Sequence, residues 1–173
     1  MLIVGVDPGS IRTGYGAILT DGRRHELLES GALVPPQNLE LALRLRHIHQ
    51  GLRDLIARLR PDALAVEDLF HAKSARSAIV LGHVRGVALL AGAEAGIRVL
   101  SYPPATVKAQ VSGEGRAQKH QVALMVGHLL RLARGMDPGD AADALAVALC
   151  AALLEAGPAA EIRVHAVAAS KRR

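Results

Sequence analysis

The first 34 residues of this 173-residue chain contain three strand-like runs that are too closely spaced to leave room for a helix. The runs cover 2–6, 13–20 and 25–34, and Asp21-Gly22 between the second and the third is a hairpin turn signal. Runs joined by such short connections pair as antiparallel neighbours, because a parallel pair needs a long crossover. The sequence therefore predicts that the chain begins with a three-stranded antiparallel meander.

After Pro35-Pro36 the pattern changes to helices that alternate with single strands. Apolar residues at spacings of three and four predict an amphipathic helix over 41–59, for which Asn38 is the candidate N-cap. Strands expected at 63–67 and 98–102 each follow a helix, so they should run parallel to the first strand. The fold class is therefore α/β: a mixed five-stranded sheet, with three antiparallel and two parallel strands, flanked by helices. Further helices are expected at 74–94, 105–111, 118–134 and 140–155.

Length and composition indicate one domain and a reducing compartment. We expect the domain over 1–156 and a mobile basic tail over 157–173. Asp7 interrupts the N-terminal apolar run before a signal peptide can form, no uninterrupted apolar run is long enough to span a membrane, and Cys150 is the only cysteine. We therefore expect a cytoplasmic protein without membrane association. The net charge of +5 favours an anionic partner such as nucleic acid.

Carboxylates occur at three separate places where the predicted fold can bring them together. Asp7 ends an otherwise apolar strand, and Glu67 ends the fourth strand, which would lie near Asp7 if the two strands are neighbours. Asp140 and Asp143 open an alanine-rich helix with the spacing that places both on one face. Taken singly, Asp140 also fits a helix N-cap and Glu67 a solvated strand end. Together the four predict a site for Mg²⁺ or Mn²⁺, because two such ions can activate a water and stabilise the leaving oxygen of a phosphodiester.

A lone aromatic residue and two lysines have both a structural and a functional interpretation. Phe70 is either a core residue or a ring that stacks on bases, and its polar neighbours weaken the first interpretation. Lys108 and Lys119 are either solvated or, near a metal site, in contact with the scissile phosphate.

Several segments, in order and at matching spacing, resemble the RuvC-type Holliday junction resolvases over nearly the whole chain. The resemblance implies a ribonuclease H-like fold and a homodimer that cuts four-way DNA junctions by paired symmetric nicks, in recombination and repair. It also implies two Mg²⁺ or Mn²⁺ ions per active site and action with the RuvA and RuvB branch-migration proteins. The segments are Gly5-Val6-Asp7-Pro8-Gly9-Ser10, Thr13-Gly14-Tyr15-Gly16, Val66-Glu67-Asp68-Leu69-Phe70, Ala72-Lys73, Leu81-Gly82, Arg85-Gly86-Val87, Val107-Lys108, Lys119, Gln121-Val122 and Asp140-Ala141-Ala142-Asp143-Ala144-Leu145-Ala146.

Carried over by position, the resemblance assigns roles to the candidate residues. The metal-binding catalytic tetrad would be Asp7, Glu67, Asp140 and Asp143, and Phe70 would engage bases near the junction centre. The resemblance also makes the two lysines catalytic residues that contact phosphate. The full set of expected DNA contacts is Phe70, Lys73, Ser74, Arg76, Lys108 and Lys119.

Three other functions remain open at the level of sequence. Actin-like sugar kinases and ATPases also begin with such a strand and hairpin, although they need two domains and 173 residues hold one. A related ribonuclease H-like nuclease that acts on RNA shares the opening strand and turn. A non-catalytic junction-binding protein would use the same carboxylates structurally.

Overall fold

Five strands form one mixed sheet, with the first strand at its centre. The computed structural model describes residues 1–68 and 74–155. The strand order is β3-β2-β1-β4-β5, in which β2 is antiparallel to both β1 and β3, and β4 is parallel to both β1 and β5. The predicted sheet and the adjacency of the first and fourth strands are confirmed. The strands are β1 (Leu2–Asp7), β2 (Thr13–Thr20), β3 (His25–Leu33), β4 (Ala63–Glu67) and β5 (Arg98–Tyr102).

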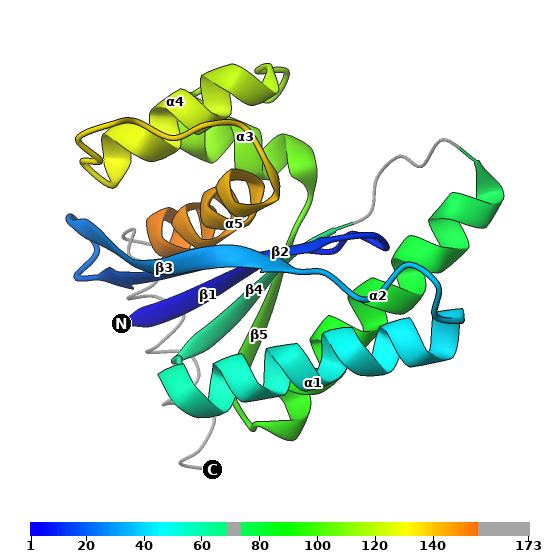
Figure 1. Cartoon of the computed structure of the whole chain (residues 1–173). Helices are drawn as coiled ribbons and strands as arrows, with labels where there is room; N and C mark the ends of the chain where they lie inside the picture. The colour runs from blue at the N-terminus through cyan, green and yellow to red at the C-terminus, as the bar shows by residue number, and fades with distance from the viewer. Residues whose placement is uncertain (69–73, 156–173) are drawn as a thin grey trace, which may run out of the picture.

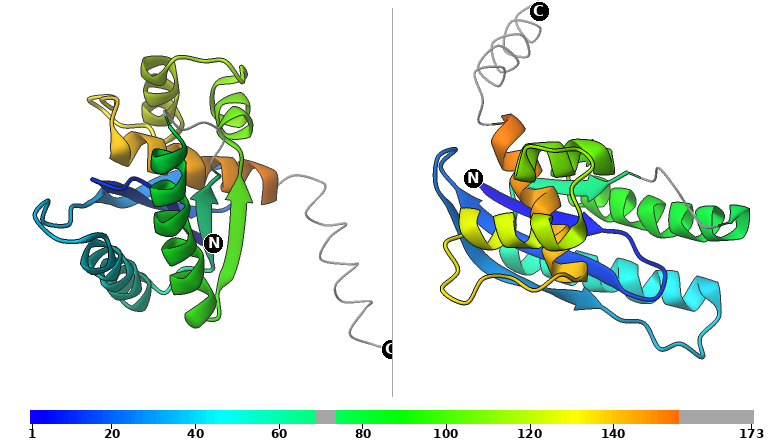
Figure 2. Two further views of the ribbon diagram at one scale, coloured as in Figure 1. Left: turned by 90° about the vertical axis from the view of Figure 1, so that its right-hand side faces the viewer. Right: turned by 90° about the horizontal axis from the view of Figure 1, so that it is seen from above.

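Helices cover both faces of the sheet, as Figure 1 shows. Helices α1 and α2 lie on one face, and α3, α4 and α5 lie on the other; the right view of Figure 2, from above, has α3, α4 and α5 in front of the sheet. Helix α5 packs directly on β1 and β2, and α3 and α4 pack on α5. The helices are α1 (Leu41–Leu59), α2 (Ala75–Glu94), α3 (Pro104–Ser112), α4 (Lys119–Leu129) and α5 (Asp140–Glu155).

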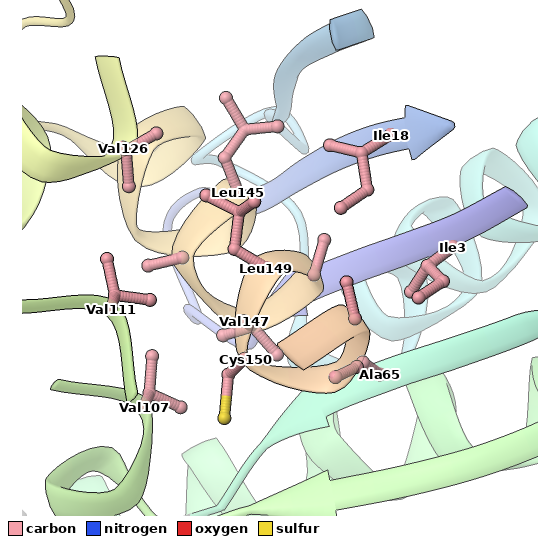
Figure 3. Close-up of a cluster of buried hydrophobic side chains, with 14 of the residues drawn as sticks. Ile3, Ile18, Ala65, Val107, Val111, Val126, Leu145, Val147, Leu149 and Cys150 are labelled. Carbon is pink, nitrogen blue, oxygen red and sulfur yellow. The ribbon is translucent and has the colours of Figure 1, made fainter. Parts of the chain in front are cut away.

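The alternation of side chains along β1 and β4 decides which face the carboxylates occupy. Ile3 and Ala65 are buried against α5, as Figure 3 shows, whereas their sequence neighbours Val4 and Val66 belong to the core beneath α1 and α2. Because side chains alternate with a period of two, position 7 of β1 shares a face with Ile3, and position 67 of β4 shares a face with Ala65. Both strand-end carboxylates therefore belong to the α5 face.

Helix α5 is buried over most of its surface because it lies between the sheet and the layer of α3 and α4. Leu145, Leu149 and Cys150 are all fully buried. A helix that is apolar all round is expected to be enclosed in this way. Its distance from β1 is set by Gly5, where a Cβ atom would lie 2.1 Å from the carbonyl oxygen of Ala144.

Two sequence predictions about helix ends are wrong. The helix expected over 118–134 ends at Leu129, because Arg131 takes a left-handed conformation (φ 54°) and the amide of Leu132 donates to the carbonyl of Gly127. Neither glycine nor proline marks that end in the sequence. Asn38 lies in a turn, and the N-cap of α1 is Glu40, without a side-chain capping bond. The predicted tail over 157–173 lies outside the described residues, so its boundary at 156 remains a prediction.

Helix α2 has a largely exposed outer face. By length and composition alone it is long and apolar enough to cross a membrane, the one such helix in the described part of the chain. A helix that packs against other protein surfaces can meet the same two conditions. One side of α2 buries Val84, Ala88 and Ala91 against the core, whereas Ile79 and Leu90 on the outer side are 62% and 51% exposed.

We expect Gly5→Ala to destabilise the fold strongly, because the added methyl meets backbone atoms of α5 that cannot move independently. Overpacking of this kind costs about 2 kcal/mol or more of the free energy of unfolding. Gly139→Ala is the control: a Cβ atom there meets nothing within 4 Å. Urea denaturation should show a change of less than about 1 kcal/mol for the control, and equal losses for the two variants would contradict this account of the packing.

Candidate active site

Two carboxylates lie side by side at the carboxyl ends of the central parallel strands. Asp7 is the last residue of β1 and Glu67 the last of β4, and the register pairs Val6 with Val66 just before them. A side-chain hydrogen bond joins the two carboxyl groups, so one of them carries a proton. The sequence prediction that these residues meet is confirmed.

The start of α5 brings two further carboxylates to the same edge of the sheet. Gly14 at the beginning of β2 allows the approach, because a Cβ atom there would lie 2.1 Å from the carbonyl oxygen of Asp140. Asp143 lines a cavity of about 230 Å³ together with Asp7 and Glu67. Asp140 does not line it, and its Oδ2 lies 2.6 Å from Nε of Arg12. Three of the four predicted metal ligands therefore share one cavity, and the fourth is paired with an arginine.

Both predicted lysines line the same cavity, one from α3 and one from α4. Lys119 Nζ lies 2.5 Å from Oδ2 of Asp143, and this hydrogen bond is the main reason that the pKa of Lys119 is raised. Lys108 lines this cavity and also an adjoining one of about 580 Å³, which Arg116 lines as well. The cavity thus holds two lysines together with three carboxylates.

The pKa values of the two strand-end carboxyls are raised far above their ordinary range. Burial is the larger cause for both: the pKa of Asp7 rises to about 6, with repulsion from Asp143 as the next cause, and that of Glu67 to about 8, with repulsion from Asp7 as the next cause. At neutral pH the pair therefore retains a proton in the absence of a cation. A cation bound between them would favour the ionised forms.

The donor set suits Mg²⁺ or Mn²⁺, although its geometry is not yet that of a closed coordination sphere. Carboxylate oxygens are the ligands these ions prefer, and the repulsion among Asp7, Glu67 and Asp143, which adds to burial in raising the two pKa values, is what such an ion would relieve. Within residues 1–68 and 74–155, no three acidic, histidine or cysteine side chains are already arranged around one ion position. Two of the candidate ligands are paired with cations, Asp143 with Lys119 and Asp140 with Arg12.

Apart from Lys108 and Lys119, the predicted DNA contacts belong in sequence to the segment between β4 and α2 or to the start of α2. Phe70 and Lys73 are outside the described residues. Ser74 is the N-cap of α2, where its Oγ accepts a hydrogen bond from the amide of Ser77. Arg76 is exposed on the first turn of that helix. A capping role explains Ser74 without DNA, and contact with DNA stays a prediction for all four residues.

Arg12 and Arg116 are site residues that the sequence analysis missed. Arg12 belongs to the turn between β1 and β2, and Arg116 to the connection between α3 and α4. Arginine is common throughout the chain, so neither stands out by residue type. Only the folded turn, which brings Arg12 to a carboxylate 128 positions further along the chain, distinguishes it.

Comparison with known proteins agrees with this geometry. Residues 3–151 match the family described as crossover junction endodeoxyribonuclease RuvC. The RuvC proteins of Desulforamulus reducens and Halorhodospira halophila are each 49% identical, over 87% and 90% of this chain and 92% of each relative. The structure of Thermus thermophilus RuvC in complex with a Holliday junction substrate superposes with a TM-score of 0.84 at 34% identity, covering 90% of this chain and 95% of that one.

A more distant structure extends the likeness of the fold. The yeast mitochondrial Holliday junction resolvase has a TM-score of 0.66 at 12% identity, over 89% of this chain and 78% of that one. The fold is that of the ribonuclease H-like resolvases. The chain belongs to the RuvC family and is a crossover junction endodeoxyribonuclease. The expected class is confirmed, and the kinase, the RNA nuclease and the non-catalytic binding protein are set aside.

In EDTA, we expect the stability of the protein to fall as the pH rises from about 5 to about 8.5. The folded state binds a proton on Glu67 up to a pKa of about 8, whereas the unfolded chain releases it near its ordinary pKa of 4.5. The stabilisation is therefore complete below the unfolded pKa and is lost as the pH rises through the folded one. Urea denaturation at both pH values measures the loss.

Glu67→Gln should lose less stability than the wild type over this range, by about 1 kcal/mol or more, because the amide resembles the protonated carboxyl and does not titrate. Glu114→Gln, at an exposed position between α3 and α4, should follow the wild type. A Glu67→Gln variant with the same pH dependence as the wild type would contradict the raised pKa.

Proposed function

We propose that this endonuclease resolves four-way DNA junctions by hydrolysis of two symmetric phosphodiester bonds, with two Mg²⁺ or Mn²⁺ ions per active site. The observation that carries the proposal is the meeting of Asp7, Glu67 and Asp143 in one cavity with Lys108 and Lys119. Its substrate is supported by the family and by the Thermus thermophilus relative, which is described in complex with a Holliday junction.

The carboxylates of the tetrad would hold the ions. Asp7 is placed between Glu67 and the start of α5, so it would contribute to both ions, and Glu67, Asp140 and Asp143 would complete the ligand set. The ions supply an activated water and stabilisation of the leaving oxygen. For this the proton shared by Asp7 and Glu67 must leave, and because the raised pKa values hold that proton at neutral pH, ion binding should strengthen as the pH rises.

The two lysines would bind the phosphate that is cut. The Lys119 ammonium is paired with Asp143. It would leave that carboxylate only for another anion, and a phosphate oxygen is one. Lys108 faces both adjoining cavities, which gives it access to the same phosphate from the α3 side. Each lysine would stabilise negative charge as it develops on the phosphoryl oxygens. Phe70, Lys73, Ser74 and Arg76 are proposed to contact the junction next to this phosphate.

The outer side of α2 supports a homodimer. Four exposed residues of α2 are spaced by four, three and four positions, so they form one stripe along the helix. They are Ile79, His83, Gly86 and Leu90. A Cβ atom on Gly86 would meet nothing within 4 Å, so the backbone is open to close approach at the middle of the stripe. A second copy can present the same stripe, and the two would bury each other's apolar residues around a twofold axis.

The proposals for partner proteins and for cellular location rest on the family resemblance and on composition. Action together with RuvA and RuvB is proposed from the family resemblance. A cytoplasmic location is proposed from the single cysteine and from the expected substrate, DNA. The homodimer explains the apolar outer side of α2 without a membrane.

The test of the activity is cleavage of a synthetic mobile four-way junction and a matched linear duplex in Mg²⁺, Mn²⁺ or EDTA. We expect paired symmetric nicks in the junction alone and none in EDTA. Asp7→Asn should lower the rate by about a hundredfold or more while junction binding is kept, because it removes a ligand charge and not a DNA contact. Asp54→Asn on α1, whose carboxylate accepts a hydrogen bond from Gln50 of the same helix, should cut like the wild type. Normal turnover of Asp7→Asn would refute the assignment.

The test of the homodimer is sedimentation of Ile79→Asp/Leu90→Asp. Two carboxylates buried face to face are strongly unfavourable, so the variant should run as a monomer at concentrations where the wild type is a dimer. Leu124→Asp places the same charge at an apolar residue of α4 that is 67% exposed, and it should leave the dimer intact. A dimeric double variant would place the interface elsewhere.

A further inference from the structure

The turn between β1 and β2 is held by contacts from three directions. Thr13 Oγ1 donates to the carbonyl of Gly9 at 2.9 Å, and the Arg44 guanidinium from α1 donates to the carbonyl of Ser10. Gln37 donates to the carbonyl of Ile11 at 3.4 Å. These contacts fix the backbone on both sides of Arg12, so its position over the start of α5 follows from the fold of the turn.

Arg12 forms an ion pair with Asp140, a member of the tetrad. Its Nε lies 2.6 Å from Oδ2 of Asp140, and the two side chains are 56% and 36% exposed. The amino end of a helix carries a partial positive charge, which repels a guanidinium. The carboxylate is therefore what holds Arg12 at this place, and anything that takes the carboxylate releases the arginine.

A divalent cation and Arg12 compete for the same carboxylate. The Oδ2 atom that faces Nε of Arg12 cannot turn into the cavity without leaving that contact, and Asp140 does not line the cavity while the pair is formed. An exposed pair of this kind contributes little free energy. The pair is therefore weak enough for a metal ion to displace.

We propose that Arg12 is the resident counter-ion of Asp140, that a divalent ion displaces it, and that the released guanidinium then binds a phosphate of the DNA backbone. This inference rests on the proposed metal-dependent function. A planar guanidinium binds phosphate through two parallel hydrogen bonds, and the half-exposed side chain has room to turn outward. Arg12 thereby couples metal loading to DNA contact.

The first test is a calorimetric titration of Mn²⁺ into the full-length protein without DNA. Arg12→Gln removes the competitor and should bind Mn²⁺ about two- to fivefold more tightly than the wild type. The matched control is Arg23→Gln, in the exposed turn at the opposite end of β2, which removes the same charge and should bind Mn²⁺ like the wild type. Equal affinity for the wild type and Arg12→Gln overturns the competition.

The second test is the salt dependence of junction binding in EDTA and in Ca²⁺. In Ca²⁺, Arg12→Gln should lower the slope of log K against log salt by about 0.9, the value for one phosphate contact. In EDTA the slopes of the wild type and Arg12→Gln should agree, because Asp140 holds the arginine. An equal loss in both conditions, or none in either, overturns the coupling.

These experiments separate the two proposals. A wild-type protein that binds no Mn²⁺ and cuts no junction in any metal would overturn the proposed function, and this inference with it. A wild type that binds Mn²⁺ and cuts the junction, while Arg12→Gln matches it in both tests, would overturn the role of Arg12 alone.

Discussion

The close packing of α5 on the centre of the sheet is the contact on which the site depends. Gly5 and Gly14 allow backbone to approach backbone, since a Cβ atom at either would lie 2.1 Å from a carbonyl oxygen of the helix. The enclosed apolar length of α5 then holds the helix in one register. That register brings Asp143 to the ends of β1 and β4. A helix displaced by one residue would turn the carboxylate away by about 100°.

The arrangement of charge follows from this packing. Carboxylates brought so close cannot all remain ionised, and three kinds of compensation are present: a proton on Asp7 and Glu67, the Lys119 ammonium on Asp143, and the Arg12 guanidinium on Asp140. A divalent cation can replace each of these positive groups, and a phosphate can pair with Lys119 or Arg12 once that side chain has left its carboxylate. Without bound ions or DNA, the carboxylate charges are therefore offset by a proton and by two side-chain cations. This suits a site that binds metal ions and DNA only when it acts.

Much of the fold and the site follows from the sequence, for identifiable reasons. Periodicity and turn signals predict every strand, and Asp7 stands out because its strand is otherwise apolar. The end of α4 was missed because a left-handed Arg131 leaves no trace in residue type. Arg12 was missed because its partner lies 128 positions away, a distance that local patterns do not cover. The pairing of Asp140 with Arg12, outside the cavity that the other three carboxylates line, likewise depends on side-chain contacts that the sequence pattern does not reveal.

The sheet separates the carboxylates from the outer side of α2, which lies in the layer on its other face. The proposed catalytic site and the proposed dimer interface are therefore built from different residues, on opposite faces of the sheet. In the homodimer proposed here, an active chain could still associate with a chain that has lost a carboxylate by mutation, because that mutation leaves the outer side of α2 unchanged. Such a mixed pair would sever one strand and release a junction that is nicked yet still joined. In that proposed homodimer, the independence of the two layers would make half-resolution the characteristic failure.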